Sequence, residues 1–266
     1  MEMEKQMNSA TAPLILTDLD DTLFQTLRKI DPEIDRDQLT PASWLDGGAV
    51  SGYMTPLQSM FHGWLAQGEL VPVTARNRLV MERTFLKGCG RAVCSHGGLV
   101  LDEEGKADRG WTEHLSSLDA ASPMSVAEAY GRVRSVLDDH GDLFRHWTIT
   151  EEGLDLYVTV KQNRDVDGDP VAMLHEVCEG AAALLPAEWK LHRNGNNAAF
   201  MPPWLGKRQA VEHVLKEIRS VSPMRPVIGF GDSTSDLPFM SLCDYMMTPS
   251  RSQVATILAT AASEHY

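Results

Sequence analysis

The stretch Leu14-Ile15-Leu16-Thr17-Asp18-Leu19-Asp20-Asp21-Thr22-Leu23 carries the strongest signal in this chain of 266 residues. Its apolar run, Leu14 to Leu16, predicts a short buried strand, and Asp18 and Asp20 follow where that strand ends. Two carboxylates at the end of a buried strand are costly unless positive charge meets them there. A divalent cation and a phosphoryl group under attack would supply that charge, whereas a solvated polar turn explains one Asp-x-Asp pair equally well.

Short apolar strands and amphipathic helices alternate on either side of a different middle part of the chain. Strands are expected at 70–73, 91–94, 226–230 and 245–247, and helices at about 77–86, from about 207 and from 250. This alternation predicts an α/β fold whose core is a doubly wound, Rossmann-like parallel sheet.

A helix with a clear beginning follows the long polar segment 24–53, and a hairpin around Asp46-Gly47-Gly48 is expected over 41–54. Thr55 is a good N-cap, Pro56 suits the first helical position, and Gly68 ends the helix. Helical spacing predicts that one apolar stripe of this helix is buried, comprising Leu57, Met60, Phe61, Trp64 and Leu65.

The pattern changes near Trp111 and changes back near Pro202. Between them, a helix is followed by two strands, and this order occurs twice, with clean period-2 alternation in 147–160. That pattern predicts a smaller α+β domain with an open antiparallel sheet. We therefore expect a discontinuous Rossmann-like core at 1–110 and 203–266, and an inserted α+β cap domain at 111–202.

Composition limits the function classes. The chain is 43% hydrophobic and has a net charge of −13, which argues against a nucleic-acid partner and against an anionic membrane surface. Residues 1–13 lack the apolar stretch of a signal peptide, and no run is long enough to span a bilayer, so a cytoplasmic location is expected. The four cysteines form no C-x-x-C pair. Nothing in the sequence indicates an oligomeric state.

Candidate catalytic residues gather at one predicted edge, because open parallel sheets bind ligands at the carboxyl ends of their strands. Asp18 is the expected nucleophile and Asp20 the expected general acid and base. A Mg²⁺ ion is expected to bind Asp18, the backbone carbonyl of Asp20 and Asp232. The set is completed by two phosphate-binding residues and an orienting acid: Thr74, Lys207 and Asp236.

This order and spacing resemble the four motifs of the haloacid dehalogenase-like superfamily. Asp18-Leu19-Asp20-Asp21-Thr22 resembles its first motif, hhhDxDxT, and Thr74, Lys207 and Gly231-Asp232-Ser233-x-x-Asp236 resemble the second, third and fourth. The inserted domain is similar to the cap of sugar-phosphate phosphatases such as sucrose-phosphate phosphatase, and of phosphomannomutases. Two features depart from the pattern: Asp21 stands where many members have Gly, and the segment 24–53 is longer than expected.

The resemblance implies a Mg²⁺-dependent phosphatase that acts on a small phosphorylated metabolite, such as a sugar phosphate, through an aspartyl-phosphate. An acid at position 20 points to phosphate esters, since the corresponding residue of the dehalogenases is not an acid. Two alternatives remain: a phosphomutase of the phosphomannomutase type, and a phospho-accepting regulatory domain without turnover. Possible substrate contacts outside the motifs are Arg76, Lys161, Arg193 and Asn196, each of which is also compatible with an ordinary exposed polar residue.

Overall fold

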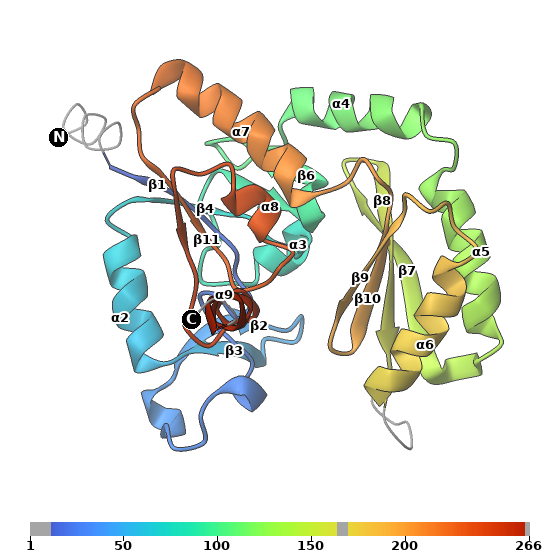
Figure 1. The fold of residues 1–266 in the computed structure, drawn as a ribbon, viewed down its shortest axis with the longest axis horizontal. Helices are drawn as coiled ribbons and strands as arrows, with labels where there is room; N and C mark the ends of the chain where they lie inside the picture. The colour runs from blue at the N-terminus through green and yellow to red at the C-terminus, as the bar shows by residue number, and fades with distance from the viewer. Residues whose placement is uncertain (1–11, 164–169, 264–266) are drawn as a thin grey trace. The chain divides into compact units, whose positions relative to one another are not determined.

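A computed structural model describes residues 12–163 and 170–263. Its described residues form two compact units, one up to Asp108 and from Lys207 onward, the other from Arg109 to Gly206 (Figure 1). The N-terminal residues 1–11, on which the expected absence of a signal peptide depends, lie outside the described residues. No helix in the described ranges is both long enough and apolar enough to cross a membrane.

A four-stranded parallel sheet forms the centre of the first unit, in the order β12-β11-β1-β4. These strands are Tyr245–Met247, Val227–Phe230, Leu14–Thr17 and Glu69–Pro72. A parallel bridge from Val73 to Val93 brings β5 (Ala92–Cys94) alongside β4. β1 lies between β11 and β4 and is fully buried, which explains its continuous apolar run. The α/β fold with a parallel core sheet is therefore confirmed.

Helix α7 (Lys207–Val221) has the most regular apolar stripe of the unit. Its buried positions recur at helical spacing, and they are Ala210, Val211, Val214, Leu215 and Ile218. The helix packs against β5, β6 (Leu99–Leu101) and the 3-10 turn Ser95–Gly97. α8 (Leu237–Met240) packs on α7 and β11, and α9 (Gln253–Ser263) is the last helix. This packing fixes Lys207, the first residue of α7, at the carboxyl edge of the sheet.

Helix α2 (Pro56–Leu65) begins as the sequence predicts, but its predicted buried stripe is wrong. Thr55 accepts a hydrogen bond from the Gln58 amide, and the Gln58 side chain accepts one from the Thr55 amide, a complete capping box. Only Leu65 is buried, however, and Leu57 and Met60 are each 78% exposed. Phe61 touches the sheet through an edge contact with Phe230. The helix thus meets the core along its C-terminal end rather than along a full face.

The helix expected at 77–86 is much shorter, because its second half pairs with the hairpin instead. α3 spans only Arg78–Met81, with Asn77 as N-cap. The Phe85 amide donates to the Ala42 carbonyl, and the Arg83 carbonyl accepts from the Trp44 amide. The partner strand is β2 (Thr40–Trp44), which with β3 (Val50–Met54) forms the expected antiparallel hairpin. Backbone groups after Met81 are therefore satisfied by strand-like bonds to a distant segment.

The second unit contains an antiparallel sheet in the order β7-β8-β10-β9. Its strands are Phe144–Glu151, Leu154–Gln162, Asn197–Met201 and Lys190–Asn194. α5 (Val126–Asp138) and α6 (Pro170–Ala182) pack on each other and on one face of this sheet (Figure 1). One helix, α4 (Arg109–Ala120), precedes this arrangement and was not expected. It buries only Trp111 and Leu115, so its apolar pattern is sparse.

Candidate active site

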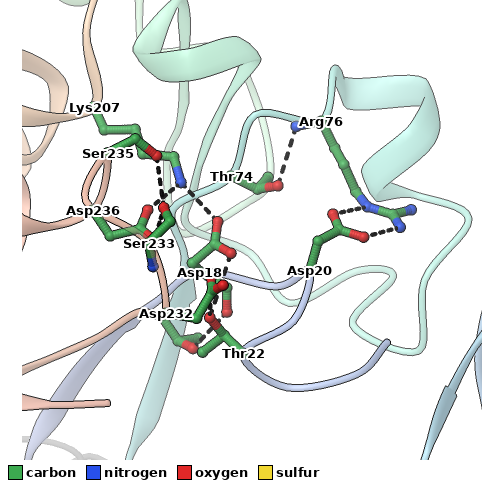
Figure 2. Close-up of polar contacts among 11 residues, drawn as sticks. Asp18, Asp20, Thr22, Thr74, Arg76, Lys207, Asp232, Ser233, Ser235 and Asp236 are labelled. Atoms are coloured by element: carbon green, nitrogen blue, oxygen red, sulfur yellow. Dashed lines mark hydrogen bonds and ion pairs between the residues drawn. The ribbon is translucent and has the colours of Figure 1, made fainter. Parts of the chain in front are cut away.

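The carboxyl ends of three neighbouring strands meet at one edge of the parallel sheet. The Asp18 amide donates to the Phe230 carbonyl at the end of β11, and the Val73 amide donates to the Thr17 carbonyl. Both bonds continue the ladder just beyond the ends of β1, β4 and β11. Residues that leave these strands next are therefore held close together, and Figure 2 shows their side chains converging.

Lys207 is bound between two carboxylates in a buried cluster. Its Nζ donates to Oδ1 of Asp18 and to Oδ1 of Asp236, at 2.7 Å in each case. The side chains of Lys207, Asp18 and Asp236 are only 8%, 10% and 1% exposed. The other Asp236 oxygen accepts hydrogen bonds from the backbone amide and the hydroxyl of Ser233. Asp236 is thus fully occupied in holding Lys207 against Asp18.

Burial dominates the electrostatics of this cluster. It raises the pKa of Asp18 to about 8, although the Lys207 ammonium opposes the shift and Asp236 adds to it. The pKa of Lys207 is raised, since attraction to both carboxylates outweighs its desolvation. Burial also raises the pKa of Asp232 to about 6, with further contributions from the charges of Asp236 and Asp21. The pocket therefore favours additional positive charge.

Asp232 lies beside Asp18 and shares a neighbour with it. The Thr22 hydroxyl is 3.1 Å from Oδ1 of Asp232 and 3.5 Å from Oδ2 of Asp18. Asp18, Asp232 and Asp236 together offer carboxylate oxygens within 4.8 Å of one another. Because both Asp236 oxygens are already bonded, Asp18 and Asp232 are the residues whose carboxylates are more available to an ion. Such hard oxygen donors fit Mg²⁺.

Asp20 points away from this cluster and is held by Arg76 (Figure 2). The Arg76 Nε and Nη2 atoms donate to the two Asp20 oxygens, at 2.7 Å each. Arg76 in turn lies over the Phe24 ring, 5.1 Å from its centroid. A bidentate pair of this kind fixes the orientation of the Asp20 carboxylate. Arg76 is thus placed next to the candidate acid and base rather than free at the surface.

Thr74 follows β4 at the same edge. Its Oγ1 accepts a hydrogen bond from the Arg76 amide, which leaves the hydroxyl hydrogen for another acceptor. The Thr74 and Arg76 carbonyls accept from the amides of His96 and Ser95. Ser95 and His96 are buried and both adopt left-handed backbone conformations, with φ of 52° and 57°. Consecutive non-glycine residues in this region are strained, and strain of this kind concentrates at functional sites.

Comparisons with known proteins agree on the fold. No protein-family model matches the chain, and no curated protein matches its sequence. Among solved structures, the C-terminal domain of trehalose-6-phosphate phosphatase from C. albicans matches with a TM-score of 0.55 and 14% identity, over 91% of this chain and 78% of that chain. Sucrose-phosphatase from Synechocystis sp., in complex with sucrose and phosphate, matches with a TM-score of 0.50 and 13% identity, over 95% and 98%. The chain therefore shares the fold of these solved phosphatase structures.

The motif residues predicted from the sequence divide into two groups in the structure. Asp18, Lys207 and Asp236 lie in one buried cluster with the partly buried Asp232 beside them, whereas Asp20 is more exposed and is bound by Arg76. The sequence predicted that Asp18, Asp232 and the backbone carbonyl of Asp20 would bind the metal. The cluster of carboxylates in the structure consists of Asp18, Asp232 and Asp236. The assignment of roles stays a prediction.

Lys161 and Arg193, two of the candidate substrate contacts, lie on opposite faces of the sheet in the second unit. His146 of β7 contacts Tyr130 of α5, so residues at alternate positions, Arg145 and Trp147, lie on the face away from the helices. Lys161 is paired with Arg145 in the register and shares that face. Arg193, in contrast, is ion-paired with Glu179 of α6 and lies on the helix face.

Asn196 lies in the turn between β9 and β10, where its carbonyl accepts from the Gln162 amide. Its neighbour Asn197 pairs in register with Lys161, so Asn197 lies on the face away from the helices. Trp147 and Asn197 were not singled out from the sequence. Strand parity could have found them, because residues that alternate with apolar helix-facing positions must lie on the opposite face.

Proposed function

We propose that this chain is a Mg²⁺-dependent phosphomonoester hydrolase that acts on a small phosphorylated metabolite, a sugar phosphate. The observation that carries the proposal is the different treatment of the two carboxylates that follow β1. Asp18 is buried against Lys207, and Asp20 is held at the rim by Arg76. A nucleophile fixed in place and an acid or base within reach of solvent suit the two steps of hydrolysis.

In the first step, an Asp18 oxygen attacks phosphorus and the bond from phosphorus to the ester oxygen breaks. The product is an aspartyl-phosphate on Asp18 and an alcohol that takes its proton from Asp20. Lys207 and the Thr74 hydroxyl stabilise the charge on the transferring group. Because Arg76 donates hydrogen bonds to both Asp20 oxygens, at least one of these bonds must break before Asp20 can pass a proton to the leaving oxygen.

In the second step, Asp20 takes a proton from water as the water oxygen attacks phosphorus. The bond from phosphorus to Asp18 breaks, and inorganic phosphate leaves with the Asp18 carboxylate restored. Asp236 keeps Lys207 directed at Asp18 throughout, since its two oxygens bind Lys207 and Ser233. Asp20 therefore has to be mobile, whereas Asp236 has to be fixed.

A bound Mg²⁺ would supply charge neutralisation of the phosphoryl oxygens and of the acidic cluster. Asp18 and Asp232 would hold it through their side chains, with the Asp20 carbonyl as a further ligand. Support comes from the charge balance, because Asp18, Asp232 and Asp236 share one buried ammonium, that of Lys207.

The second unit is proposed to act as a cap that chooses the substrate. The face of its sheet away from the helices carries Arg145, Trp147, Lys161 and Asn197, a mixture of basic, aromatic and amide groups suited to a phosphorylated sugar. The two neighbours named above are a trehalose-6-phosphate phosphatase and a sucrose-phosphatase. They favour a sugar phosphate over other metabolites.

The test is a panel of phosphorylated sugars assayed with Mg²⁺ and with EDTA. The panel includes trehalose 6-phosphate, sucrose 6-phosphate and hexose phosphates, with p-nitrophenyl phosphate as a generic ester. We expect Mg²⁺-dependent release of inorganic phosphate, with at least one sugar phosphate preferred over the generic ester. Activity that is unchanged in EDTA, or the absence of activity on every ester, would contradict the proposal.

The same assay separates the two alternatives. An isomerised sugar phosphate without free phosphate would identify a phosphomutase. A stable aspartyl-phosphate that forms once per chain and does not turn over would identify a regulatory domain. A double variant, Lys161→Ala with Asn197→Ala, is expected to raise KM for the preferred sugar phosphate more than for p-nitrophenyl phosphate. The matched control is Arg193→Ala, which changes the helix face of the same sheet.

A further inference from the structure

Two unusual features of the sequence, Asp21 and the long segment 24–53, meet in the structure. Lys29, the last residue of the 3-10 helix Leu27–Lys29, forms an ion pair with Asp21. The two side chains are 44% and 26% exposed. The segment thus reaches back to the loop that carries Asp18 and Asp20.

Asp21 has a backbone conformation that glycine would adopt more easily. Its φ is 63°, in the left-handed region, where Asp is tolerated at a modest cost. The turn is closed by a 2.7 Å hydrogen bond from the Asp21 amide to the Phe24 carbonyl. A glycine would serve this turn at least as well, so what aspartate adds is a negative charge.

That charge lies at the edge of the acidic cluster. Asp21 directly precedes Thr22, whose hydroxyl binds Asp232 and approaches Asp18. The Asp21 amide belongs to the same peptide group as the Asp20 carbonyl, a proposed ligand, so Asp21 lies between two residues that face the pocket. Any cation between Asp18 and Asp232 would therefore be attracted by Asp21 and repelled by Lys29.

Lys29 is held in position by the backbone rather than by the ion pair alone. The Gln25 amide donates to the Tyr53 carbonyl and the Tyr53 amide donates to the Gln25 carbonyl, at 3.0 and 2.8 Å. These bonds tie the start of the segment to β3, and the 3-10 helix also packs on β3. The Lys29 ammonium therefore opposes Asp21 from a fixed support.

We propose that Asp21 and Lys29 form a charge-compensating pair that sets the affinity of the acidic cluster for a divalent cation. Asp21 strengthens cation binding without being a ligand, and Lys29 limits that gain. The inference rests on the proposed function, because it takes the cation pocket between Asp18 and Asp232 as given. It also assigns a role to the segment 24–53, which the motifs leave unexplained.

The experiment is a double-mutant cycle on cation binding in the absence of substrate. Mn²⁺ binding to the metal-free full chain is measured by titration calorimetry and by the loss of the free-ion electron paramagnetic resonance signal, at low ionic strength. The variants are Asp21→Asn, Lys29→Met and the two together; asparagine tolerates a positive φ and keeps the side-chain volume. Asp46→Asn is the matched control, since Asp46 is a fully exposed partner of Arg83 in the same segment.

We expect Lys29→Met to tighten Mn²⁺ binding, and Asp21→Asn to weaken it, each on the order of 3- to 10-fold for a partly exposed charge. The double variant should return to within about twofold of the starting chain, and Asp46→Asn should not differ from it. Unchanged affinity in either single variant, with Mn²⁺ still bound by the starting chain, would overturn this inference alone. If the starting chain binds no Mn²⁺, the cation pocket and the proposed function fail as well.

Discussion

The two carboxylates that follow β1 lie only two residues apart but in opposite surroundings. The Asp18 side chain is 10% exposed and bonded to the equally buried Lys207. The Asp20 side chain is 41% exposed and bonded to Arg76 at the rim. Breaking a buried charge pair leaves an uncompensated charge, whereas an exposed pair exchanges readily with water. The structure therefore separates a buried half of the site, here called the fixed half, from a more exposed half that contains Asp20, and each prediction below tests that separation.

The largest expected effect comes from Asp18→Asn. An amide cannot attack phosphorus, so Mg²⁺-dependent hydrolysis of p-nitrophenyl phosphate should fall by at least ~10⁴-fold. Asparagine occupies the same space and can accept the Lys207 hydrogen bond, so the melting temperature of the metal-free protein should change little. Retention of more than about a hundredth of the activity would remove Asp18 from the role of nucleophile.

Lys207→Met should produce the largest loss of stability. The substitution leaves Asp18 and Asp236 facing each other without their shared cation, and losing one partner of a buried pair costs about 3–5 kcal/mol. Urea unfolding of the metal-free protein near neutral pH measures the change. Lys216→Met, an exposed lysine of the same helix, should stay within about 0.5 kcal/mol of the starting chain. Equal changes in the free energy of unfolding for the two substitutions would show that Lys207 does not hold the buried cluster together.

Asp20→Asn should slow catalysis while leaving stability almost unchanged. General acid and base catalysis is worth on the order of 10²–10⁴-fold, and both steps of the reaction need it. Rapid-quench trapping of labelled enzyme should detect an aspartyl-phosphate that decays slowly, with KM little altered. Should Asp20 serve only as a partner for Arg76, the melting temperature would fall instead and the intermediate would decay at its usual rate.

A smaller effect on the free energy of unfolding is expected from pH, and it comes from the residues of the fixed half. Because burial raises the pKa of Asp18 from 3.8 to about 8, the folded state holds this proton more tightly than the unfolded state. That contribution to stability is complete below pH 3.8 and is lost as pH rises through 8. Asp232, raised to about 6, acts in the same direction, and Lys207 stays charged throughout.

A divalent cation competes with these protons, so its stabilising effect should grow with pH. The shift in melting temperature caused by Mg²⁺, relative to EDTA, should be larger near pH 8 than near pH 5.5. In Asp18→Asn the shift should depend less on pH. A shift that is the same at both pH values would place the cation away from Asp18 and Asp232.

Sequence reasoning located the strand ends because β1 is buried on both faces and reads as a continuous apolar run. The same logic gave β4, β11 and the position of Lys207 at the first turn of α7. Each of these features is determined by a short stretch of sequence and does not depend on distant residues. The fold class and the clustering of Asp18, Lys207, Asp232 and Asp236 follow from them together with the rule for parallel sheets.

What the sequence could not give depends on partners distant in the chain. Four apolar residues of α2 have the spacing of a buried helical stripe but are exposed: Leu57, Met60, Phe61 and Trp64. Spacing does not determine how much of a helix the core covers. α3 ends early because residues 83 and 85 bond to β2. The pairings of Asp20 with Arg76 and of Asp21 with Lys29 join side chains whose directions no pattern encodes.

The left-handed turn at Ser95 and His96 has a consequence for anyone who evolves this protein toward heat tolerance. Each of these two conformations costs on the order of 1–3 kcal/mol, a cost that glycine would relieve. Selection for thermostability alone is therefore expected to favour glycine at Ser95 and His96 early. The amides of His96 and Ser95, which donate to the carbonyls of Thr74 and Arg76, would then belong to a more flexible backbone. The more stable variants would therefore be expected to lose activity.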